Sequence, residues 1–294
     1  MANLKEIRNR ISSVSSTMQI TSAMKMVSAA KLKRAQDAIV QIRPYAEKLQ
    51  EILTNLSQSL DVSENIYGQE REEKNVLYIA VTSNRGLCGG FNNNVIKKTR
   101  IIAEQSKSEG KNAIILSVGK KANDSFKKSD FHPSKEMFDG DYNEIWTNLN
   151  FTESAELAEN IMNKFKNGEL DKVVLVYNVF KNAAVQNVAV EQMLPVLPLE
   201  TEGESKAATD YIFEPNKEEI VSNLIPNSLK TQFYKALLDS HAGEHGARMT
   251  SMHKATDNAS DMLSELKLSY NKARQAAITN EILEIVGGAE ALNN

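Results

Sequence analysis

Residues 247–286, ARMTSMHKATDNASDMLSELKLSYNKARQAAITNEILEIV, contain neither glycine nor proline. Because these two residues are the main breakers of local structure, the stretch is expected to form one uninterrupted helix. At about 1.5 Å per residue, such a helix would be roughly 60 Å long, which exceeds the diameter of a small domain. It must therefore protrude, and a protruding amphipathic helix needs a partner for its apolar face.

Apolar side chains recur along this stretch at the three- and four-residue steps of a coiled-coil seam. The expected seam positions are Met252, Ala255, Ala259, Met262, Leu266, Ala273, Ala276 and Leu283. Pro226 is expected at the first position of the helix, because proline suits that position. Gly287 and Gly288 are expected to end it.

The beginning of the chain has the same design, because no glycine precedes Gly68 and the only earlier proline is Pro44. The expected seam runs through Leu4, Ile7, Ile11, Val14, Met18, Met24, Val27, Ala30, Ala35, Ala38 and Ile42. Pro44 is expected to kink this helix rather than end it. We therefore expect residues 1–60 and 210–294 to pair as an antiparallel coiled coil, provided that the middle of the chain folds as one compact unit.

That middle, residues 74–200, alternates between short β-branched runs and helical stretches. Strands are expected at Val76–Thr82, Ala113–Val118 and Val173–Val179, and helices at Asn93–Ser108, Ala122–Lys128 and Glu153–Asn167. Such alternation favours an α/β domain with a mainly parallel sheet. Val185–Leu194 is expected to add an edge strand, which Pro195 and Pro198 would stop.

Charge is unevenly distributed in this chain of net charge −3. Residues 1–50 carry nine basic and three acidic side chains, a net +6. A basic helix in an acidic protein suggests an acidic partner, and the alternative is an ordinary solvated helix face. Met24 and Met26 lie in this segment, two positions apart. They cannot both face the same partner helix, so one of them is expected to contact something else.

Targeting and redox signals are few. The start of the chain, MANLKEIRNR, lacks the apolar core that a signal peptide has. Apolar runs such as Val76–Val81 are too short to span a bilayer. Membrane association is therefore expected only through a partner. Cys88 is the single cysteine, which excludes an intramolecular disulfide and fits a reducing compartment.

The loop Thr82–Asn92, TSNRGLCGGFN, follows an expected strand and precedes an expected helix, where a phosphate-binding loop would lie. Its glycines match neither the dinucleotide-binding nor the P-loop spacing, because no lysine and hydroxyl follow Gly90. A tight turn with a buried Cys88 is the favoured interpretation, so no nucleotide cofactor is expected.

The sequence His241–His245, HAGEH, formally matches an inverted zinc-protease motif. A third ligand and a pocket are missing from the sequence nearby, and two glycines in or beside the motif weaken a helix. No metal is expected here. No Ser-His-Asp set or carboxylate pair stands out elsewhere, so the chain is not expected to have a catalytic site of its own.

Three blocks, in order, resemble the gamma subunit of F-type ATP synthases. They are MQITSAMKMVSAAKLKRAQ (18–36), TSNRGLCGGFN (82–92), and ARMTSMHKATDNAS (247–260) with LSYNKARQAAITNEILEIVGGA (268–289). Asn84 departs from the aspartate that is usual in the second block. The plant-type insertion with paired cysteines is absent, so thiol regulation is not expected.

The resemblance implies a coiled-coil shaft on a Rossmann-like α/β foot. The shaft would turn inside a ring of alpha and beta subunits, and the foot would meet the epsilon subunit and the membrane ring of c subunits. Ion flow through that ring would then drive ATP synthesis. The resemblance also implies a bacterial protein, attached peripherally to the cytoplasmic face of the inner membrane.

The resemblance further implies roles for particular residues. Contacts with the alpha and beta subunits would involve Met24, Arg248, Arg274, Gln275, Thr279 and Glu281. An apolar bearing would be formed by Ile282, Leu283, Ile285 and Val286, and the c-ring contact by Tyr211, Phe213 and Glu214. Each of these residues could instead be an ordinary solvated or internally packed one.

Three other functions remain open from the sequence. A non-rotary coiled-coil scaffold would have the same helices without a fixed stoichiometry. A nucleic-acid-binding protein is disfavoured, because the basic helix lacks interleaved aromatic residues and the whole chain is acidic. A nucleotide-binding enzyme would hydrolyse ATP alone, which we do not expect.

Overall fold

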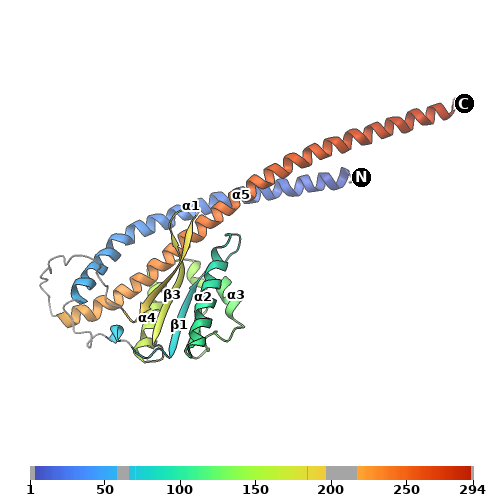
Figure 1. Ribbon diagram of the computed structural model, residues 1–294. Helices are drawn as coiled ribbons and strands as arrows, with labels where there is room; N and C mark the ends of the chain where they lie inside the picture. Colours follow the sequence, from blue (N-terminus) through green and yellow to red (C-terminus); the bar gives the residue numbers. More distant parts are fainter. Residues whose placement is uncertain (1–3, 58–65, 70, 184, 197–216, 293–294) are drawn as a thin grey trace. The chain divides into compact units, whose positions relative to one another are not determined.

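A computed structural model describes residues 4–57, 66–69, 71–183, 185–196 and 217–292 (Figure 1). Its internal packing divides these residues into two units. The first unit contains residues 4–28 and 248–292, and the second contains the rest. The two long helices of the chain, α1 (Leu4–Ser57) and α5 (Lys217–Leu292), each contribute to both units.

The first unit is a pair of antiparallel helix segments. The Arg8 guanidinium donates to the Tyr270 hydroxyl at 2.9 Å, and the Thr256 hydroxyl donates to that of Thr21 at 2.9 Å. The two residue numbers of each pair add to 278 or 277, so residue numbers rise along one helix as they fall along the other. The expected antiparallel pairing of the chain ends is therefore confirmed.

The seam of this pair differs in detail from the expected one. Val27 and Met262 are exposed, at 57% and 52%, although both were expected in the seam. The covered positions of α1 are instead Leu4, Ile7, Ile11, Val14, Met18, Thr21, Lys25 and Ser28, and those of α5 are Met252, Thr256, Ala259, Leu263, Leu266, Tyr270, Ala273 and Ala277. Both series keep strict three- and four-residue steps. Small polar residues such as Thr21, Ser28 and Thr256 occupy several seam positions, so the apolar pattern alone did not locate the seam.

The long helices also pass through the expected breakers. Helix α1 continues past Pro44, as expected. Pro226 lies inside α5, which begins at Lys217, so its expected place at the first helical position is wrong. Gly287 and Gly288 do not end α5 either. A helical glycine costs only about 1 kcal/mol, and α5 continues for about one further turn, to Leu292.

The second unit contains a four-stranded sheet in the order β2-β1-β3-β4. Strands β1 (Asn75–Val81), β2 (Asn112–Val118) and β3 (Lys172–Phe180) are parallel, and β4 (Gln186–Leu194) is an antiparallel edge strand. The expected mainly parallel sheet, with an added edge strand, is therefore confirmed. Its parallel strands are hydrophobic runs because helices cover both faces.

Helices α2 (Phe91–Ser108) and α3 (Lys120–Phe126) pack on one face of the sheet, through a core that includes Val95, Ala122 and Phe126. Helix α4 (Phe151–Lys166) and the part of α5 in this unit pack on the other face, through Ile161, Phe165 and Phe233. Two short 3-10 turns, η2 (Ile66–Gly68) and η3 (Glu144–Trp146), complete the described elements. Figure 1 shows this layered arrangement.

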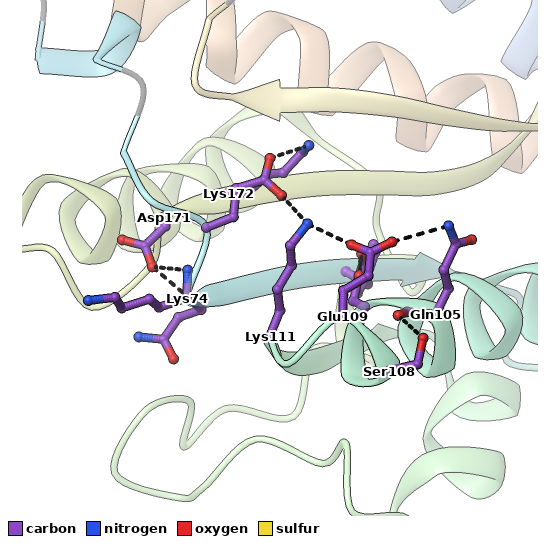
Figure 2. Close-up of polar contacts among 11 residues, drawn as sticks. Lys74, Gln105, Ser108, Glu109, Lys111, Asp171 and Lys172 are labelled. Carbon is purple, nitrogen blue, oxygen red and sulfur yellow. Dashed lines mark hydrogen bonds and ion pairs between the residues drawn. The ribbon is translucent and has the colours of Figure 1, made fainter.

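Polar side chains join the amino ends of the three parallel strands (Figure 2). Lys111 and Lys172 each donate to one oxygen of the Glu73 carboxylate at 2.7 Å. Asp171, just before β3, accepts from the backbone N–H of Asn75 at 2.7 Å. These bonds link residues far apart in sequence, so they fix the strand starts relative to one another.

Candidate functional site

The carboxyl-terminal part of α5 in the first unit carries most of the sequence-predicted contact residues. Arg274, Gln275, Thr279 and Glu281 are all exposed there. The Thr279 hydroxyl donates to the backbone carbonyl of Gln275 at 3.0 Å, one turn earlier in the helix. The other three side chains are long and polar, and they are available to a partner.

Met24 and Arg248, the other two predicted contact residues, are less accessible. Met24 is half-buried, whereas its neighbour Met26 is 64% exposed. Arg248 is only 7% exposed, so the chain itself covers most of this side chain. A contact between Arg248 and another subunit stays a prediction, and it would use only the small exposed part.

The apolar residues near the end of α5 have no partner helix within the described part of the chain. In the antiparallel register, Leu4 lies opposite about residue 274, so no described residue of α1 lies opposite position 278 or beyond. Residues 278–289 are all exposed. Exposure is 49% for Ile278, 54% for Ile282, 63% for Leu283, 70% for Ile285 and 55% for Val286. Apolar side chains gathered in this way mark an interaction surface.

A second exposed apolar group lies on α1. Ile20, Met26 and Val27 are 60%, 64% and 57% exposed. The exposure of Met26 agrees with the expectation that one of Met24 and Met26 faces away from the partner helix. Val27 was expected in the seam and Ile20 was not assigned, and the location of the true seam at Thr21, Lys25 and Ser28 puts both on the outside. The signal that could have found them is the strict heptad through those polar residues.

The middle of the helix pair is polar. The Thr21 hydroxyl bonds to the Met18 carbonyl at 3.1 Å as well as to Thr256, and Lys25 Nζ lies 3.5 Å from His253 Nδ1. His253 Nδ1 is also 3.4 Å from the Asp257 carboxylate. Polar seam residues lower stability but favour one register, because other registers lose these bonds.

The predicted c-ring residues Tyr211, Phe213 and Glu214 lie outside the described residues. No helix in the described parts of the chain is both long and apolar enough to cross a bilayer.

The loop between β1 and α2 is a tight turn with several internal hydrogen bonds. The Asn92 side-chain oxygen accepts from the backbone N–H and hydroxyl of Ser83, at 2.9 and 3.0 Å. Leu87 and Gly89 adopt positive φ angles of 63° and 59°. Cys88 is 1% exposed, and its Sγ lies 3.2 Å from the Asn92 amide nitrogen. Side chains of the loop thus satisfy several of its polar groups, and the buried Cys88 agrees with the expected tight turn.

The two histidines of the HAGEH motif lie side by side on α5, with their Nε2 atoms 3.1 Å apart. Trp146 stacks on His241 with ring centroids 5.9 Å apart. No three His, Cys, Asp or Glu side chains in the described ranges are grouped to hold a metal ion. The arrangement is that of two packed imidazoles sharing a hydrogen bond.

The glycines of that region have a packing role that the sequence did not reveal. A Cβ on Gly243 would lie 3.3 Å from both the Phe91 ring and Gln186. A Cβ on Gly246 would lie 3.1 Å from the Cα atom of Ala183. Both glycines therefore let α5 approach the sheet side of the second unit closely.

Comparisons with known proteins agree over the whole chain. The family model described as ATP synthase matches residues 3–292. The ATP synthase gamma chain of Flavobacterium johnsoniae is 60% identical over 294 residues, which cover 100% of both chains. That of Christiangramia forsetii is 58% identical over 295 residues, again covering 100% of both.

Solved structures share the fold. The rotor of the Euglena gracilis mitochondrial ATP synthase aligns with a TM-score of 0.66 at 22% identity, covering 94% of this chain and 98% of that one. A second structure of the same enzyme, comprising OSCP, F1 and c-ring, contains a chain that aligns with a TM-score of 0.67 at 24% identity, covering 98% and 94%.

Proposed function

The chain belongs to the ATP synthase gamma-chain family, and from this premise we propose that it is the central rotor shaft of an F-type ATP synthase. In this role it has no catalytic site of its own. It transmits the rotation of the membrane c-ring to the catalytic sites of the alpha/beta hexamer, and the reverse during ATP hydrolysis.

The antiparallel helix pair of the first unit is the observation that carries this proposal. Two helices wound along one seam resist bending and twisting better than either alone, which a shaft requires. The pair has different side chains on each side, with Met26 and Val27 on one helix and Arg274 and Gln275 on the other. Rotation of such an asymmetric surface presents different contacts to each beta subunit in turn.

The proposed contacts with the hexamer are partly polar. Arg274, Gln275, Thr279 and Glu281 are exposed, long or hydroxyl-bearing side chains. Polar contacts that are screened by water and salt are individually weak, so no single rotational position of the shaft is bound too tightly to leave. Met24 and Arg248 are proposed to contribute less, because both are more covered.

The apolar end of α5 is proposed to turn in a bearing formed by the hexamer. Ile282, Leu283, Ile285 and Val286 are each more than half exposed. At about 100° of rotation per residue, they fall within roughly 160° of the helix circumference and form one apolar side. Apolar packing is non-directional, so this side slides along an apolar collar as the shaft turns.

The remaining assignments also follow from the family. We propose residues 1–60 and 210–294 as the shaft and 74–200 as the foot. The foot would contact the epsilon subunit and the c-ring, the latter through Tyr211, Phe213 and Glu214. The chain would lie at the cytoplasmic face of a bacterial inner membrane, held there by the complex. A non-rotary scaffold is not favoured, given 60% identity to a gamma chain over the full length.

Rotation of the assembled complex tests the proposal. A bead is attached through a cysteine introduced as Lys166→Cys, at an exposed position of α4, while Cys88 is too buried to compete. We expect one copy of the chain per alpha/beta hexamer and rotation of the bead only when ATP is present. Several copies per hexamer, or a bead that stays still while ATP is hydrolysed, would contradict the shaft role.

A further inference from the structure

Helices α2 and α3 form a basic surface that the shaft role does not require. Residues 85–130 carry ten Lys and Arg and four Asp and Glu, a net +6 in a chain of net −3. Both helices pack on the same face of the sheet (Figure 1). Most of their charged side chains are exposed, so these lie on the outer side of that layer. A surface with one dominant sign attracts partners of the opposite sign.

Most of this charge is not neutralised internally. Among the described residues, five exposed cations of this surface form no ion pair with a carboxylate: Lys97, Lys98, Arg100, Lys120 and Lys128. On the opposite face of the sheet, by contrast, Lys164 pairs with Glu169 at 3.0 Å and Lys230 with Glu159 at 2.8 Å. Lys166 and Lys235 on that face are also exposed and form no ion pair among the described residues, so the α2 and α3 layer differs in that five such cations gather on it.

A groove of about 420 Å³ lies in this surface, between α2 and residues 126–131. Its accessible aromatic wall is the partly buried ring of Phe131, while Phe126 lies beneath the groove at 1% exposure. The Arg100 guanidinium lies 5.7 Å from the centroid of the Phe126 ring, and Lys107 Nζ lies 5.6 Å from that of Phe131. Lys107 is also paired with Asp130 at 3.1 Å. Arg100 contacts the Ser125 hydroxyl at 3.3 Å and keeps most of its donors available.

We propose that the outer surface of α2 and α3 is a docking site for an acidic segment of another protein. In this complex an apolar or aromatic side chain fills the groove against Phe131, and a carboxylate binds Arg100 in a charge-assisted hydrogen bond. The neighbouring lysines steer the segment and strengthen its binding. A recessed aromatic groove suits one inserted side chain, whereas a membrane surface would meet only the protruding lysines.

Site-specific photo-cross-linking in cells that assemble the full complex tests this proposal. A benzophenone amino acid replaces Glu104, which lines the groove, and in a matched control it replaces Glu156, an exposed glutamate of α4. We expect a cross-link at position 104, but not at 156, to one segment that mass spectrometry identifies as acidic. Arg100→Glu should lower its yield roughly tenfold, because like charges then face each other. Arg100→Lys should retain most of it.

Several outcomes would overturn the proposal. These are cross-links to lipid, cross-links to a segment without net negative charge, equal yields at positions 104 and 156, and a yield that Arg100→Glu does not change. If Arg100→Glu fails to fold, Lys97→Glu with Lys98→Glu provides the same charge reversal on exposed side chains. Co-purification of the chain with the alpha and beta subunits is measured in the same cells. A failed docking site is thereby distinguished from a failed shaft role.

Discussion

Asn84 uses both ends of its side-chain amide to join three segments. Its oxygen accepts from the Lys120 backbone N–H at 2.9 Å, and its nitrogen donates to the Asn143 carbonyl at 2.8 Å. The resemblance to the gamma-subunit family suggested aspartate at this position as the usual residue. An aspartate would keep the first bond but could not donate the second, so the amide is the better fit to this structure.

Asn84→Asp is therefore expected to lower the free energy of unfolding by about 1 kcal/mol. Loss of the donor costs about 1–3 kcal/mol, and the gain from a carboxylate near the first turn of α3 is about 0.3–1 kcal/mol. Urea denaturation followed by circular dichroism measures the difference. Asn148→Asp, at an exposed side chain, serves as the control and should be neutral. A variant as stable as the parent would show that the Asn143 bond contributes nothing.

Glu73 should make the second unit sensitive to acid. Its hydrogen bonds from Lys111 and Lys172 hold the pKa of this carboxyl below its ordinary value of 4.5. Its contribution is thus present above pH 4.5 and is lost as the pH falls through the lower, folded-state pKa. Because the group is about one-third exposed, we expect Glu73→Gln to cost only about 1 kcal/mol at pH 7.

The check is urea denaturation of the Glu73→Gln variant from pH 7 down to pH 3. The difference from the parent should shrink as the pH falls. Glu72→Gln removes a pair in which both side chains are more than 70% exposed, and it should change little at any pH. A constant difference between Glu73→Gln and the parent over the whole range would exclude this linkage.

Asp239 has the opposite pH dependence. Burial raises the pKa of this carboxyl from 3.8 to about 6, although Lys235 and Arg43 oppose the shift. Its stabilising contribution is complete below pH 3.8 and is lost as the pH rises through 6. Asp239→Asn is therefore expected to raise the free energy of unfolding at pH 8 by about 1–2 kcal/mol and to have little effect at pH 4. Asp139→Asn, on an exposed loop, is the control; equal effects at both pH values would be inconsistent with the shift.

At the scale of whole elements, two glycines of α5 have opposite roles. A Cβ on Gly246 would be 3.1 Å from the Ala183 Cα atom and 3.2 Å from its carbonyl oxygen, so backbone would have to move. A Cβ on Gly287 would meet nothing within 4 Å. We expect Gly246→Ala to destabilise the second unit by about 1–3 kcal/mol. Gly287→Ala should instead stabilise the end of α5 by roughly 0.5–1 kcal/mol.

Thermal unfolding of both glycine variants, with helix content followed at 222 nm, tests this prediction. Since the substitution is the same, only the surroundings of each glycine can give the two effects different signs. A destabilising Gly287→Ala would mean that this glycine is needed where it stands, as the sequence pattern had indicated.

The elements themselves could largely be predicted from sequence. The strands lie within about one residue of the expected ranges, because buried parallel strands are uniform β-branched runs that Gly and Asn interrupt. The ends of α5 were not predictable. Proline and glycine mark helix ends only on average, and α5 continues through both Pro226 and Gly287. The exact seam was missed for a different reason. Met262 and Leu263 are adjacent and both apolar, so only the partner helix decides which of them is covered.

The candidate site was predictable to a similar degree. The exposed side chains of Arg274, Gln275 and Glu281 agree with a contact role, which stays a prediction. The spacing of Met24 and Met26 indicated that one of them faces outward, but Ile20 and Val27 were missed, because hydrophobicity alone does not distinguish a seam from an interaction surface. The basic surface of α2 and α3 was missed because its charges are spread over two helices that only the fold brings together.

At the scale of the whole molecule, Arg274→Ala with Gln275→Ala is expected to impair coupling without harming the fold. Both side chains are exposed, so truncation should change the free energy of unfolding by less than about 0.5 kcal/mol. ATP synthesis by inverted membrane vesicles should fall severalfold, because contacts with the hexamer are lost. Lys272→Ala, an exposed neighbour on the same helix, is the control. Full synthesis in the double variant would remove these two residues from the proposed contacts.

The change from two helices to one near residue 278 has a mechanical consequence. Under torque, the paired and single sections of the first unit behave as two springs joined end to end, each carrying the same load. The softer spring then takes up the larger angle, so elastic energy collects in the last turns of α5. A cross-link or an added helix that stiffened those turns would reduce the angle through which the whole rod twists under the same torque.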